Sequence, residues 1–415
     1  MTLTETIDGA TLDFILSPVG RLALTTLQAR SLDEQYTLSV LQTLRREFTA
    51  TQAGALLTQA RLRQRAVAKF PQAAELFFTT EALEQATAWP IAQHRAAWID
   101  TYAPPGPVLD LGCGIGGDLL ALAQRRDVIA FDIDPARIRL AQANVIALGL
   151  QDRVQFVQAD WTQALAAGTL PLAAAAFADP ARRVDGRRVF TLEAMQPPLS
   201  QLLALQQLIP HLGVKTMPGI QDAEVPAQAG VEFISHAGVC KEAILWFGNL
   251  AQQVRWASVH TATGWQMRLG DGDQSPPVGP LAVGNYLHEP DPALIRAGAF
   301  TELCHQLQAH LLDAQIAYLV SPVCQTHPLV QTFVIHEIHS FNLKLLNRRL
   351  QARGYHIVEL KKRGLPFQPE ELRNRLKLPA TGKPGVVIFT RRGDERLMLI
   401  GERIGGLSPK SLGEN

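Results

Sequence analysis

The stretch VLDLGCGIGGD (residues 108–118) decides how the middle of the chain folds. It starts as a short apolar run containing Asp110, and glycines then occupy every second position before a helix-like segment: Gly112, Gly114 and Gly116. Glycine adopts backbone conformations that other residues avoid, so such a turn lets the backbone approach a ligand closely. Ligands of open α/β sheets bind at the carboxyl ends of strands, where this turn lies. We therefore expect a ligand site here, although dinucleotide-binding folds use a related turn with GxGxxG spacing.

Alternating patterns after this turn predict the fold class. Further short apolar runs, separated by helix-like stretches, lie at residues 128–133, 154–158, 173–178, 212–217 and 242–247. Strand and helix in repetition indicate a doubly wound, mostly parallel α/β sheet. Asp134-Pro135 begins a helix over 135–148, with Asp as N-cap and Pro in the first turn. Residues 231–247 have the spacing of a hairpin, which predicts an antiparallel strand at the end of the sheet.

The whole chain divides into four parts. Residues 1–100 are rich in Ala, Leu, Gln and Arg, with apolar residues at helical spacing, so we predict a helical region. Residues 101–250 hold the predicted sheet, and residues 251–284, which include DGDQSPPVGP, are expected to be a connector. Residues 285–405 alternate between strand-like and helix-like stretches, which predicts a second, smaller α/β domain.

Composition excludes several classes of protein. With 415 residues, 47% hydrophobic and 19% charged, the chain is neither disordered nor fibrous in composition. Its four cysteines are scattered, and no Cys/His group has zinc-site spacing, so we expect neither a disulfide framework nor a metal. No apolar run reaches the ~18 residues of a membrane span, and the N-terminus lacks the basic start of a signal peptide. We expect a cytoplasmic protein without a membrane partner.

Two further carboxylates follow predicted strands. Asp132 lies 22 residues after Asp110, where a carboxylate can accept hydrogen bonds from both hydroxyls of a ribose. Asp160 follows the third strand, in a position that suits an adenine amino group. Each acid alone is also a candidate helix cap, the commoner role at a strand-to-helix junction. In order after the glycine turn, they favour an adenosine-containing cofactor.

With these motifs, residues 107–247 resemble a class I S-adenosylmethionine-dependent methyltransferase domain. The resemblance implies a Rossmann-like, seven-stranded sheet whose last strand is antiparallel, with S-adenosyl-L-methionine as the cofactor over Gly112–Gly116. It also implies that Asp132 holds the ribose, Asp160 the adenine, and Asp110 the region near the methionine amine.

The segment AFADPARR (176–183) lies where this family carries its catalytic motif. Members that methylate exocyclic amines of bases have Asn/Asp-Pro-Pro-aromatic there. The Asp179 carboxylate and the Pro180 carbonyl can each accept an N–H bond, which aims the nitrogen lone pair at the methyl group. Ala181 and Arg182 replace the second proline and the aromatic, so no residue of this turn can stack a flipped base. The resemblance implies Asp179 and Pro180 as catalytic residues.

We call Asp179-Pro180 and the two residues after it the reaction turn. An arginine cluster beside this turn is a first candidate for substrate binding. Arg182, Arg183 and Arg187 indicate either phosphate or carboxylate binding, or a solvated, salt-bridged loop. Lys215, at the end of the fifth predicted strand, lies at the same rim, and we interpret it as structural rather than functional.

The C-terminal domain contains a second basic cluster. Residues 344–396 hold 14 Lys and Arg against 5 Asp and Glu, a net charge of +9 in a chain of net charge +1. Such asymmetry suits a polyanion, because phosphate contacts supply most non-specific affinity. Lys361, Lys362 and Arg363 are therefore expected to contact RNA, the alternative being that they only flank a strand end.

Other stretches extend the resemblance over nearly the whole chain. GRRVFTLEAMQPPL (186–199), GVKTMPGI (213–220) and PEELRNRLKL (369–378) resemble a bacterial family of methyltransferases with a C-terminal THUMP-like domain. True THUMP domains occur in RNA-modifying enzymes, so the resemblance implies an RNA substrate. The leading hypothesis is methylation of structured RNA (tRNA or rRNA), at an exocyclic base nitrogen. The alternatives are a protein or small-molecule methyltransferase, and a non-catalytic RNA-binding protein that retains the cofactor fold.

Overall fold

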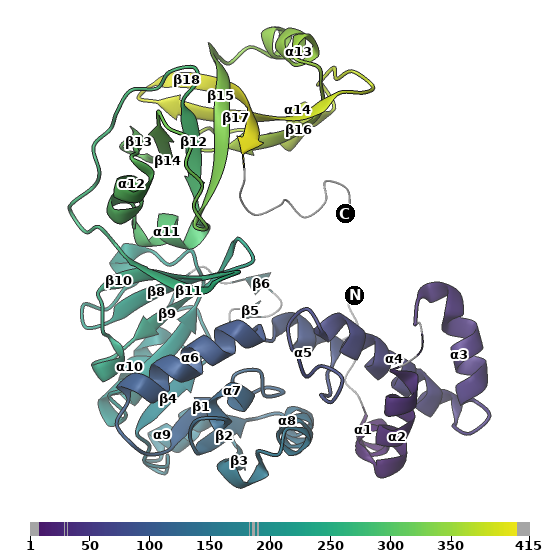
Figure 1. The fold of residues 1–415 in the computed structure, drawn as a ribbon. Helices are drawn as coiled ribbons and strands as arrows, with labels where there is room; N and C mark the ends of the chain where they lie inside the picture. Colours follow the sequence, from purple (N-terminus) through teal and green to yellow (C-terminus); the bar gives the residue numbers. More distant parts are fainter. Residues whose placement is uncertain are drawn as a thin grey trace. The chain divides into compact units, whose positions relative to one another are not determined.

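The computed structural model describes residues 8–28, 30, 32–181, 183–184, 187–188 and 191–404 (Figure 1). The chain divides into two compact units. One comprises Met1–Gly230 with Ile244–Gln252, and the other comprises Val231–Ala243 with Gln253–Asn415. None of the helices among the described residues has the length and apolar character that a membrane crossing requires.

The first unit begins with helices, which confirms the predicted helical region. Their bounds are α1 (Gly9–Leu16), α2 (Pro18–Leu27), α3 (Thr37–Leu44), α4 (Ala50–Ala66), α5 (Thr80–Gln85) and α6 (Trp89–Tyr102). The longest, α4, begins at a capping box in which the Thr49 hydroxyl accepts from the backbone N–H of Gln52 at 3.3 Å, while the Gln52 side chain accepts from Thr49 N at 3.1 Å.

A mixed sheet confirms the predicted α/β class. Its hydrogen-bonded order is β11-β10-β8-β9-β7-β4-β1-β2-β3. The strands are β1 (Val108–Leu111), β2 (Val128–Asp132), β3 (Val154–Gln158), β4 (Ala175–Ala178), β7 (Leu212–Thr216), β8 (Gly230–His236), β9 (Val239–Trp246), β10 (Arg255–Thr261) and β11 (Gly264–Leu269). Its helices are α7 (Leu119–Ala123), α8 (Pro135–Ala147), α9 (Trp161–Ala166) and α10 (Leu199–Leu208).

The sheet has two strands more than the seven expected. They are β10 and β11, an antiparallel hairpin within residues 251–284, where we expected a connector. The hairpin is difficult to recognise in the sequence because most residues of β11 are half-exposed or exposed, as is usual for an edge strand.

Parallel pairing determines where the site lies in the first unit. β1 pairs in parallel with β2 and β4, β2 with β3, and β4 with β7. The carboxyl ends of these five strands therefore meet at one edge of the sheet, which is the usual ligand-binding edge of such folds. The glycine turn, Asp132, Asp160, Asp179 and Lys215 all lie at or just beyond these strand ends.

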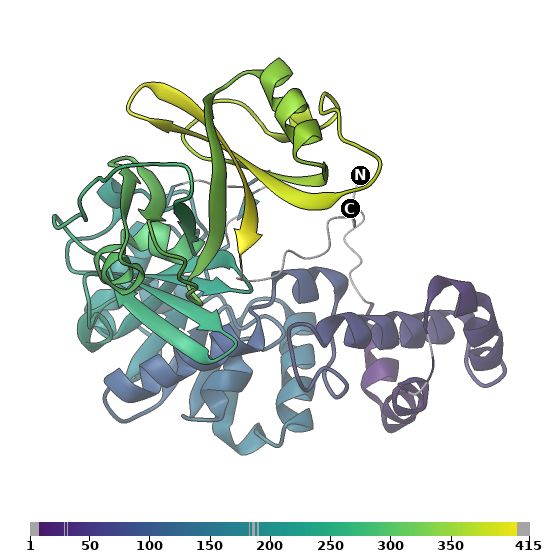
Figure 2. The ribbon, with the colours of Figure 1, turned by 45° about the horizontal axis from the view of Figure 1, so that its top comes forward.

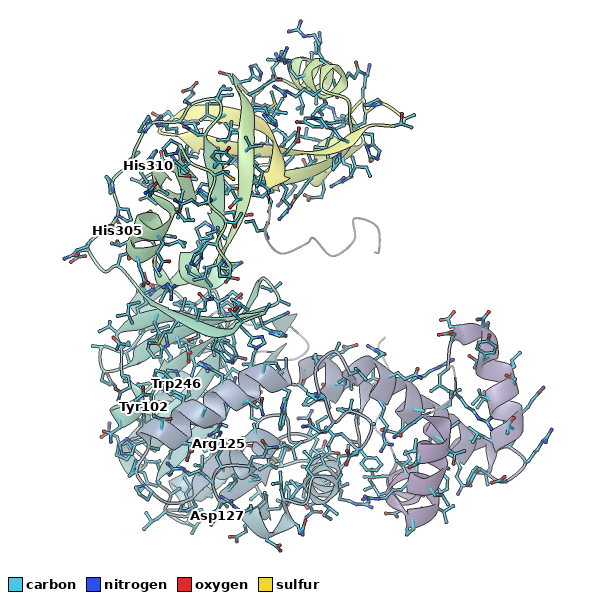
Figure 3. The ribbon with its side chains drawn as sticks, in the orientation of Figure 1. Tyr102, Arg125, Asp127, Trp246, His305 and His310 are labelled. Carbon is cyan, nitrogen blue, oxygen red and sulfur yellow. The ribbon has the colours of Figure 1, made fainter. Side chains whose placement is uncertain are left out.

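Helix α6 is attached to the first unit by aromatic side chains. The ring of Trp98 lies 4.6 Å from that of Tyr102 and 6.2 Å from that of Trp246 between centroids (Tyr102 and Trp246 are labelled in Figure 3). The Trp98 indole N–H also donates to the carbonyl of Leu250 at 3.0 Å. Trp246 is fully buried, so these contacts fix the helix against the core.

The second unit contains another sheet, with strand order β13-β14-β12-β15-β18-β17-β16. Its strands are β12 (Tyr286–Pro290), β13 (His310–Asp313), β14 (Ile316–Ser321), β15 (Val330–Ser340), β16 (Tyr355–Lys362), β17 (Lys383–Arg392) and β18 (Glu395–Ile404). Its helices are α11 (Pro292–Ala297), α12 (Thr301–Leu307), α13 (Leu343–Ala352) and α14 (Glu370–Arg373). α13 packs against β16, and its Leu346 and Leu350 are buried in the core of this unit. Figures 1 and 2 show the backbone of this helix and of the sheet.

One helix expected in this unit is divided in two. The stretch PDPALIRAGAFTELCHQL (residues 290–307) has the pattern of a single helix, but α11 ends just before Gly298, which has φ +68°. This left-handed conformation stops a helix and strongly favours glycine. Gly354, with φ +66°, follows α13 as expected for a helix stop.

Candidate functional site

The glycine turn is held to the end of strand β2 by backbone hydrogen bonds. The amides of Gly112 and Cys113 both donate to the carbonyl of Phe131 at 2.9 Å. Three glycines of the turn have positive φ: Gly112 (+90°), Gly114 (+55°) and Gly116 (+101°). Side chains at these positions would strain the backbone, and a Cβ added at Gly114 would meet no atom within 4 Å. The turn is therefore built on glycine conformations, and at Gly114 the space beside the backbone is open.

Asp132 braces this turn. Its Oδ2 accepts from the Gly114 amide at 2.9 Å, and its Oδ1 accepts from the Asp134 amide at 2.9 Å. The residue is only 6% exposed. Each carboxylate oxygen has two lone pairs, so both retain capacity for a ligand hydroxyl. Asp134 has a separate task, because its side chain caps helix α8 by accepting from Ala136 N at 2.8 Å.

Asp110 is a buried acid without a full set of partners. It is 3% exposed, and its Oδ2 has no hydrogen-bond partner among the described residues. Burial raises the pKa of Asp110 well above its ordinary value, and the negative charges of Asp118 and Asp179 raise it further. A cationic group that donates to Oδ2 would supply the missing partner. The chemistry of this position therefore fits the ammonium group of an amino-acid moiety.

Asp160 caps the helix that follows it. Its Oδ1 accepts from the amide of Thr162 at 2.9 Å and from its hydroxyl at 2.7 Å, and Gln163 Nε2 donates to Oδ2 at 3.2 Å. The hydroxyl bond lowers the pKa of Asp160. Capping leaves lone pairs on Oδ2, so this residue combines a structural bond with acceptor capacity for a ligand.

Asp179 follows strand β4 and forms a partly buried ion pair that we did not predict. Lys215 Nζ, on β7, donates to Asp179 Oδ2 at 2.7 Å and to Thr87 Oγ1 at 3.2 Å. Lys215 is 4% exposed, whereas the Asp179 side chain is 34% exposed. A Cβ added at Gly112 would lie 3.8 Å from the carbonyl oxygen of Asp179, so the reaction turn adjoins the glycine turn.

A series of hydrogen bonds leads from Lys215 to residues of the N-terminal helical region. Thr87 Oγ1 donates to Asp118 Oδ2 at 3.1 Å, and Arg95 NH1 donates to Asp118 Oδ1. Arg95 is fully buried, with its guanidinium 4.2 Å from the ring centroid of Phe177 on β4. Thr87 and Arg95, both before position 100, therefore contact Asp118 directly after the glycine turn. No local pattern indicates Thr87 or Arg95, whereas Asp118, directly after the glycine turn, would have been detectable.

A second set of hydrogen bonds connects the N-terminal helical region to the glycine turn. The side-chain amide of Asn144, on α8, donates to the carbonyls of Ile115 at 2.9 Å and Phe77 at 3.1 Å. Its oxygen accepts from Phe77 N at 2.7 Å, and the residue is 1% exposed. All these hydrogen bonds are satisfied in the interior, so the turn is rigidly held.

The arginine cluster follows the reaction turn directly. Ala181 and Gln196 exchange two backbone bonds of 2.8 and 3.1 Å, which close the base of the segment that holds the cluster. Arg183 and Arg187 lie in the short antiparallel strands β5 (Arg183–Val184) and β6 (Arg187–Arg188). Arg182 lies outside the described residues, as do the side chains of β5 and β6.

The three basic residues at the end of β16 do not form one free surface. Lys361 Nζ lies 2.5 Å from Glu289 Oε2, and Arg363 NH2 lies 3.3 Å from Glu289 Oε1. Alternation along the strand sends Lys362 to the opposite face. RNA could contact Lys361 or Arg363 only in exchange for bonds that they already make.

Comparisons with known proteins show which families the chain is similar to. A model described as a methyltransferase domain matches residues 108–178, and one described as THUMP domain-like matches residues 330–403. A domain of unknown function matches residues 8–66. An uncharacterized S-adenosylmethionine-dependent methyltransferase of Mycobacterium tuberculosis is 34% identical over 343 residues, which are 80% of this chain and 91% of that protein.

The chain belongs to the family of S-adenosylmethionine-dependent methyltransferases. The fold of this methyltransferase agrees, since the crystal structure of a protein from Porphyromonas gingivalis, described as a methyltransferase, matches it with a TM-score of 0.70. That match has 20% identity and covers 93% of this chain and 98% of the other. A release factor glutamine methyltransferase of Rhodospirillum rubrum is 47% identical over only 64 residues, 15% of this chain and 20% of that protein.

The cofactor site leads to a first prediction. Asp132→Ala should weaken S-adenosylmethionine binding by more than tenfold, about 1.4 kcal/mol or more, because it removes the expected ribose acceptor and the hydrogen bond to the Gly114 amide. Calorimetric titration measures this loss. Asp134→Ala is the matched control, since it removes a neighbouring carboxylate that caps α8 and pairs with Arg137 at 3.6 Å, and it should leave the affinity unchanged. Equal affinities of wild type and Asp132→Ala would contradict the assignment.

Proposed function

We propose that this methyltransferase transfers the methyl group of S-adenosylmethionine to structured RNA (tRNA or rRNA), at an exocyclic base nitrogen. The observation that supports this reaction most directly is the position of the Asp179 carboxylate. Asp179 adjoins the glycine turn, and its Oδ2 accepts from Nζ of the buried Lys215 at 2.7 Å. The THUMP-like match and the net charge of +9 over residues 344–396 support an RNA substrate.

The cofactor is held by the acids at the strand ends. Asp110 Oδ2 binds the ammonium group, Asp132 the ribose hydroxyls and Asp160 the adenine amino group. Gly112, Gly114 and Gly116 leave room for the ligand against the backbone. When bound, S-adenosylmethionine supplies an electrophilic methyl group on a sulfonium, whose positive charge suits this acidic edge of the sheet.

Asp179 and Pro180 orient the acceptor nitrogen. The lone pair of an aromatic amine is delocalised into its ring, which makes the nitrogen a weak nucleophile. Asp179 Oδ1 and the Pro180 carbonyl each accept one N–H, so the nitrogen becomes pyramidal and its lone pair points away from the two acceptors. This is catalysis by position and electrostatics, with no covalent intermediate on the protein.

Lys215 positions Asp179 for this task. The ammonium occupies Oδ2 and leaves Oδ1 for the substrate. It also adds positive charge to an edge that contains Asp110, Asp118 and Asp132, which lowers the cost of an ionised carboxylate there. Thr87 accepts from the same ammonium and so fixes the direction from which Lys215 approaches.

The arginines after the reaction turn bind substrate phosphates. Arg182, Arg183 and Arg187 follow Pro180 within a few residues, in a segment whose base is closed by the pairing of Ala181 with Gln196. Arginine suits this role because its planar guanidinium binds phosphate with two parallel bonds. Lys361, Lys362 and Arg363 remain candidate RNA contacts on the second unit.

A protein acceptor is the second candidate, supported by the local likeness to a release factor glutamine methyltransferase. Extract from cells that lack the gene, incubated with the enzyme and the labelled cofactor, separates the two. We expect label that ribonuclease releases and protease does not, and RNA binding that weakens steeply with salt. Label that only protease releases would replace the RNA assignment by a protein one. Cofactor binding without label in any fraction would favour a non-catalytic role.

A second prediction concerns Asp110. The pKa of Asp110 is raised in the folded protein, so the folded state binds a proton more tightly than the unfolded state. The free energy of unfolding therefore falls as pH rises above the unfolded value of about 3.9. Asp110→Asn should remove this fall and raise the melting temperature of the cofactor-free protein at pH 7 by about 2 °C or more.

The same variant should bind the cofactor about tenfold more weakly, because a hydrogen bond to a charged group contributes about 1.5–3 kcal/mol. Thermal denaturation with and without S-adenosylmethionine measures both effects. A lower melting temperature at pH 7 together with unchanged affinity would contradict the assignment of Asp110 to the cofactor.

A further inference from the structure

The cations in and directly after helix α13 have two different surroundings. On one side, Arg349 Nε lies 2.5 Å from Glu337 Oε2, and Arg353 binds Oε1 of the same carboxylate. Burial alone would raise the pKa of Glu337, but hydrogen bonds from Arg349, His339 and Arg353 lower it to about 2. Arg349 and Arg353 therefore stabilise the second unit from within.

The other side of α13 carries cations without such partners. Lys344 and Arg348 are one helical turn apart, and Asn347 is likewise about one turn from Lys344. Lys344 and Arg348 are both exposed, and neither has an ion-pair partner within the part of the chain that the structure describes. Nothing in the described fold accounts for these two charges.

Asn347 connects this helical face to the segment after α14. Its Nδ2 donates to the carbonyl of Arg375 at 3.1 Å, and its Oδ1 accepts from the amide of Lys377 at 2.8 Å. Leu376, between them, packs on the apolar core, while Arg375 and Lys377 are exposed. Helix α13 and the segment after α14 are therefore in direct contact through Asn347.

Together with Arg373 at the end of α14, these residues form what we call the α13 basic surface: Lys344, Arg348, Arg373, Arg375 and Lys377. All five are exposed, and none has an ion-pair partner among the described residues. The nearest acids in sequence are Glu370 and Glu371, in the first turn of α14. Five cations on two joined elements have the charge and rigidity that a phosphate backbone requires.

An aromatic ring lies at the start of the same helix. Phe341, two residues before α13, is 39% exposed and stacks on Phe367 with centroids 5.6 Å apart at 28°. Phe389 contacts both rings edge-on. A fixed, partly exposed ring beside cations suits an unpaired base. A membrane surface would instead require an exposed apolar helix face, but Leu346 and Leu350 of α13 are buried.

We propose that the α13 basic surface binds the phosphate backbone of the RNA substrate, with Phe341 available to a base. This inference rests on the proposed RNA methyltransferase function and specifies which face of the THUMP-like unit holds the RNA. It differs from the expectation for Lys361 and Arg363, which bind Glu289.

The test is the binding of fluorescently labelled bulk tRNA to the full-length double variant Arg348→Glu/Arg375→Glu at several salt concentrations. We expect affinity to fall about tenfold or more, with a salt slope smaller by about one to two phosphate contacts. Lys241→Glu/Arg396→Glu is the matched control, because it makes the same charge change at exposed residues of the second unit outside the surface. It should bind nearly as wild type. Glu370→Lys, which adds a cation beside Arg373, should strengthen binding.

The outcomes separate this proposal from the proposed function. An equal loss of tRNA affinity in the test and control variants would contradict the proposed surface. Wild-type protein that binds anionic phospholipid vesicles but no RNA would contradict it too. Weakened binding confined to the test variant would support the surface even if no methyl group entered RNA. The two double variants could also bind RNA equally well and methylate it equally well. That result would be compatible with the proposed function but would rule out the α13 basic surface as the RNA-binding site.

Discussion

Replacing Asp179 by alanine should abolish most methyl transfer and leave the cofactor in place. Asp179 supplies an acceptor at the reacting nitrogen, so we expect the rate constant of transfer to fall about 10²- to 10³-fold, the usual loss for one preorganised hydrogen-bonding group. The affinity for S-adenosylmethionine should change little, because we assign the binding of that ligand to Asp110, Asp132 and Asp160 and not to Asp179. Single-turnover transfer of labelled methyl groups and calorimetric titration measure the two quantities separately.

An asparagine variant sharpens this test. Asp179→Asn keeps a side-chain oxygen that accepts an N–H, but it removes the charge that pairs with Lys215 at 2.7 Å. We expect transfer between that of wild type and of Asp179→Ala. Full activity of Asp179→Ala would contradict the proposed role of the reaction turn, and loss of cofactor binding by either variant would show that Asp179 belongs to the cofactor site instead.

Replacing Lys215 by methionine should have the second-largest effect. Methionine approximates the length and volume of lysine in this buried position, but it leaves Asp179 Oδ2 without its partner. Misplacement of a reacting group by about 1 Å can cost about 100-fold in rate, and we expect a loss of up to this size in the rate constant. Substrate affinity should be nearly unchanged, since Lys215 is 4% exposed and does not reach the surface.

A merely structural role for Lys215 makes a different prediction. In that case the folded fraction would fall and the remaining enzyme would keep its rate constant. Lys215→Arg, which retains the cation, should recover part of the rate. Thr87→Val should lose less than Lys215→Met because the bond from the Lys215 ammonium to Asp179 is kept. Equal rate constants of wild type and Lys215→Met, corrected for folded protein, would exclude positioning.

Local sequence was sufficient to place the glycine turn, Asp132 and Asp160 at one edge of the sheet. The glycine turn, Asp132 and Asp160 each follow an apolar strand directly, so their place at the carboxyl edge follows from parallel pairing alone. The sequence left open whether Asp132 and Asp160 cap helices or bind a ligand, and the structure answers only the first part of this question. Asp160 does cap its helix, whereas Asp132 braces Gly114 and leaves capping to Asp134.

The reaction half depends on contacts that no local pattern reveals. Lys215 meets Asp179 only because β4 and β7 are neighbours, and we had interpreted it as structural. Thr87 and Arg95 come from a helical region that composition alone cannot connect to the sheet. The hairpin of β10 and β11 was missed for another reason: its outer strand buries too little apolar surface to show alternation.

Charge patterns were informative about the region but not about individual residues. The net charge of residues 344–396 marks the second unit as basic, yet Lys361 and Arg363 prove to be partners of Glu289, which lies more than 70 positions earlier. Such pairs depend on strand order, because β12, β15, β18, β17 and β16 must first assemble in that sequence across the sheet. Only then does it become visible which cations remain unpaired.

The most direct test of the central claim is methyl transfer from labelled S-adenosylmethionine to purified RNA. RNA from a strain that lacks this gene should accept label from the wild-type enzyme and almost none from Asp179→Ala, and RNA from the parent strain should accept little because its sites are already methylated. Absence of label in RNA from the deletion strain, with the cofactor bound normally, would contradict the account.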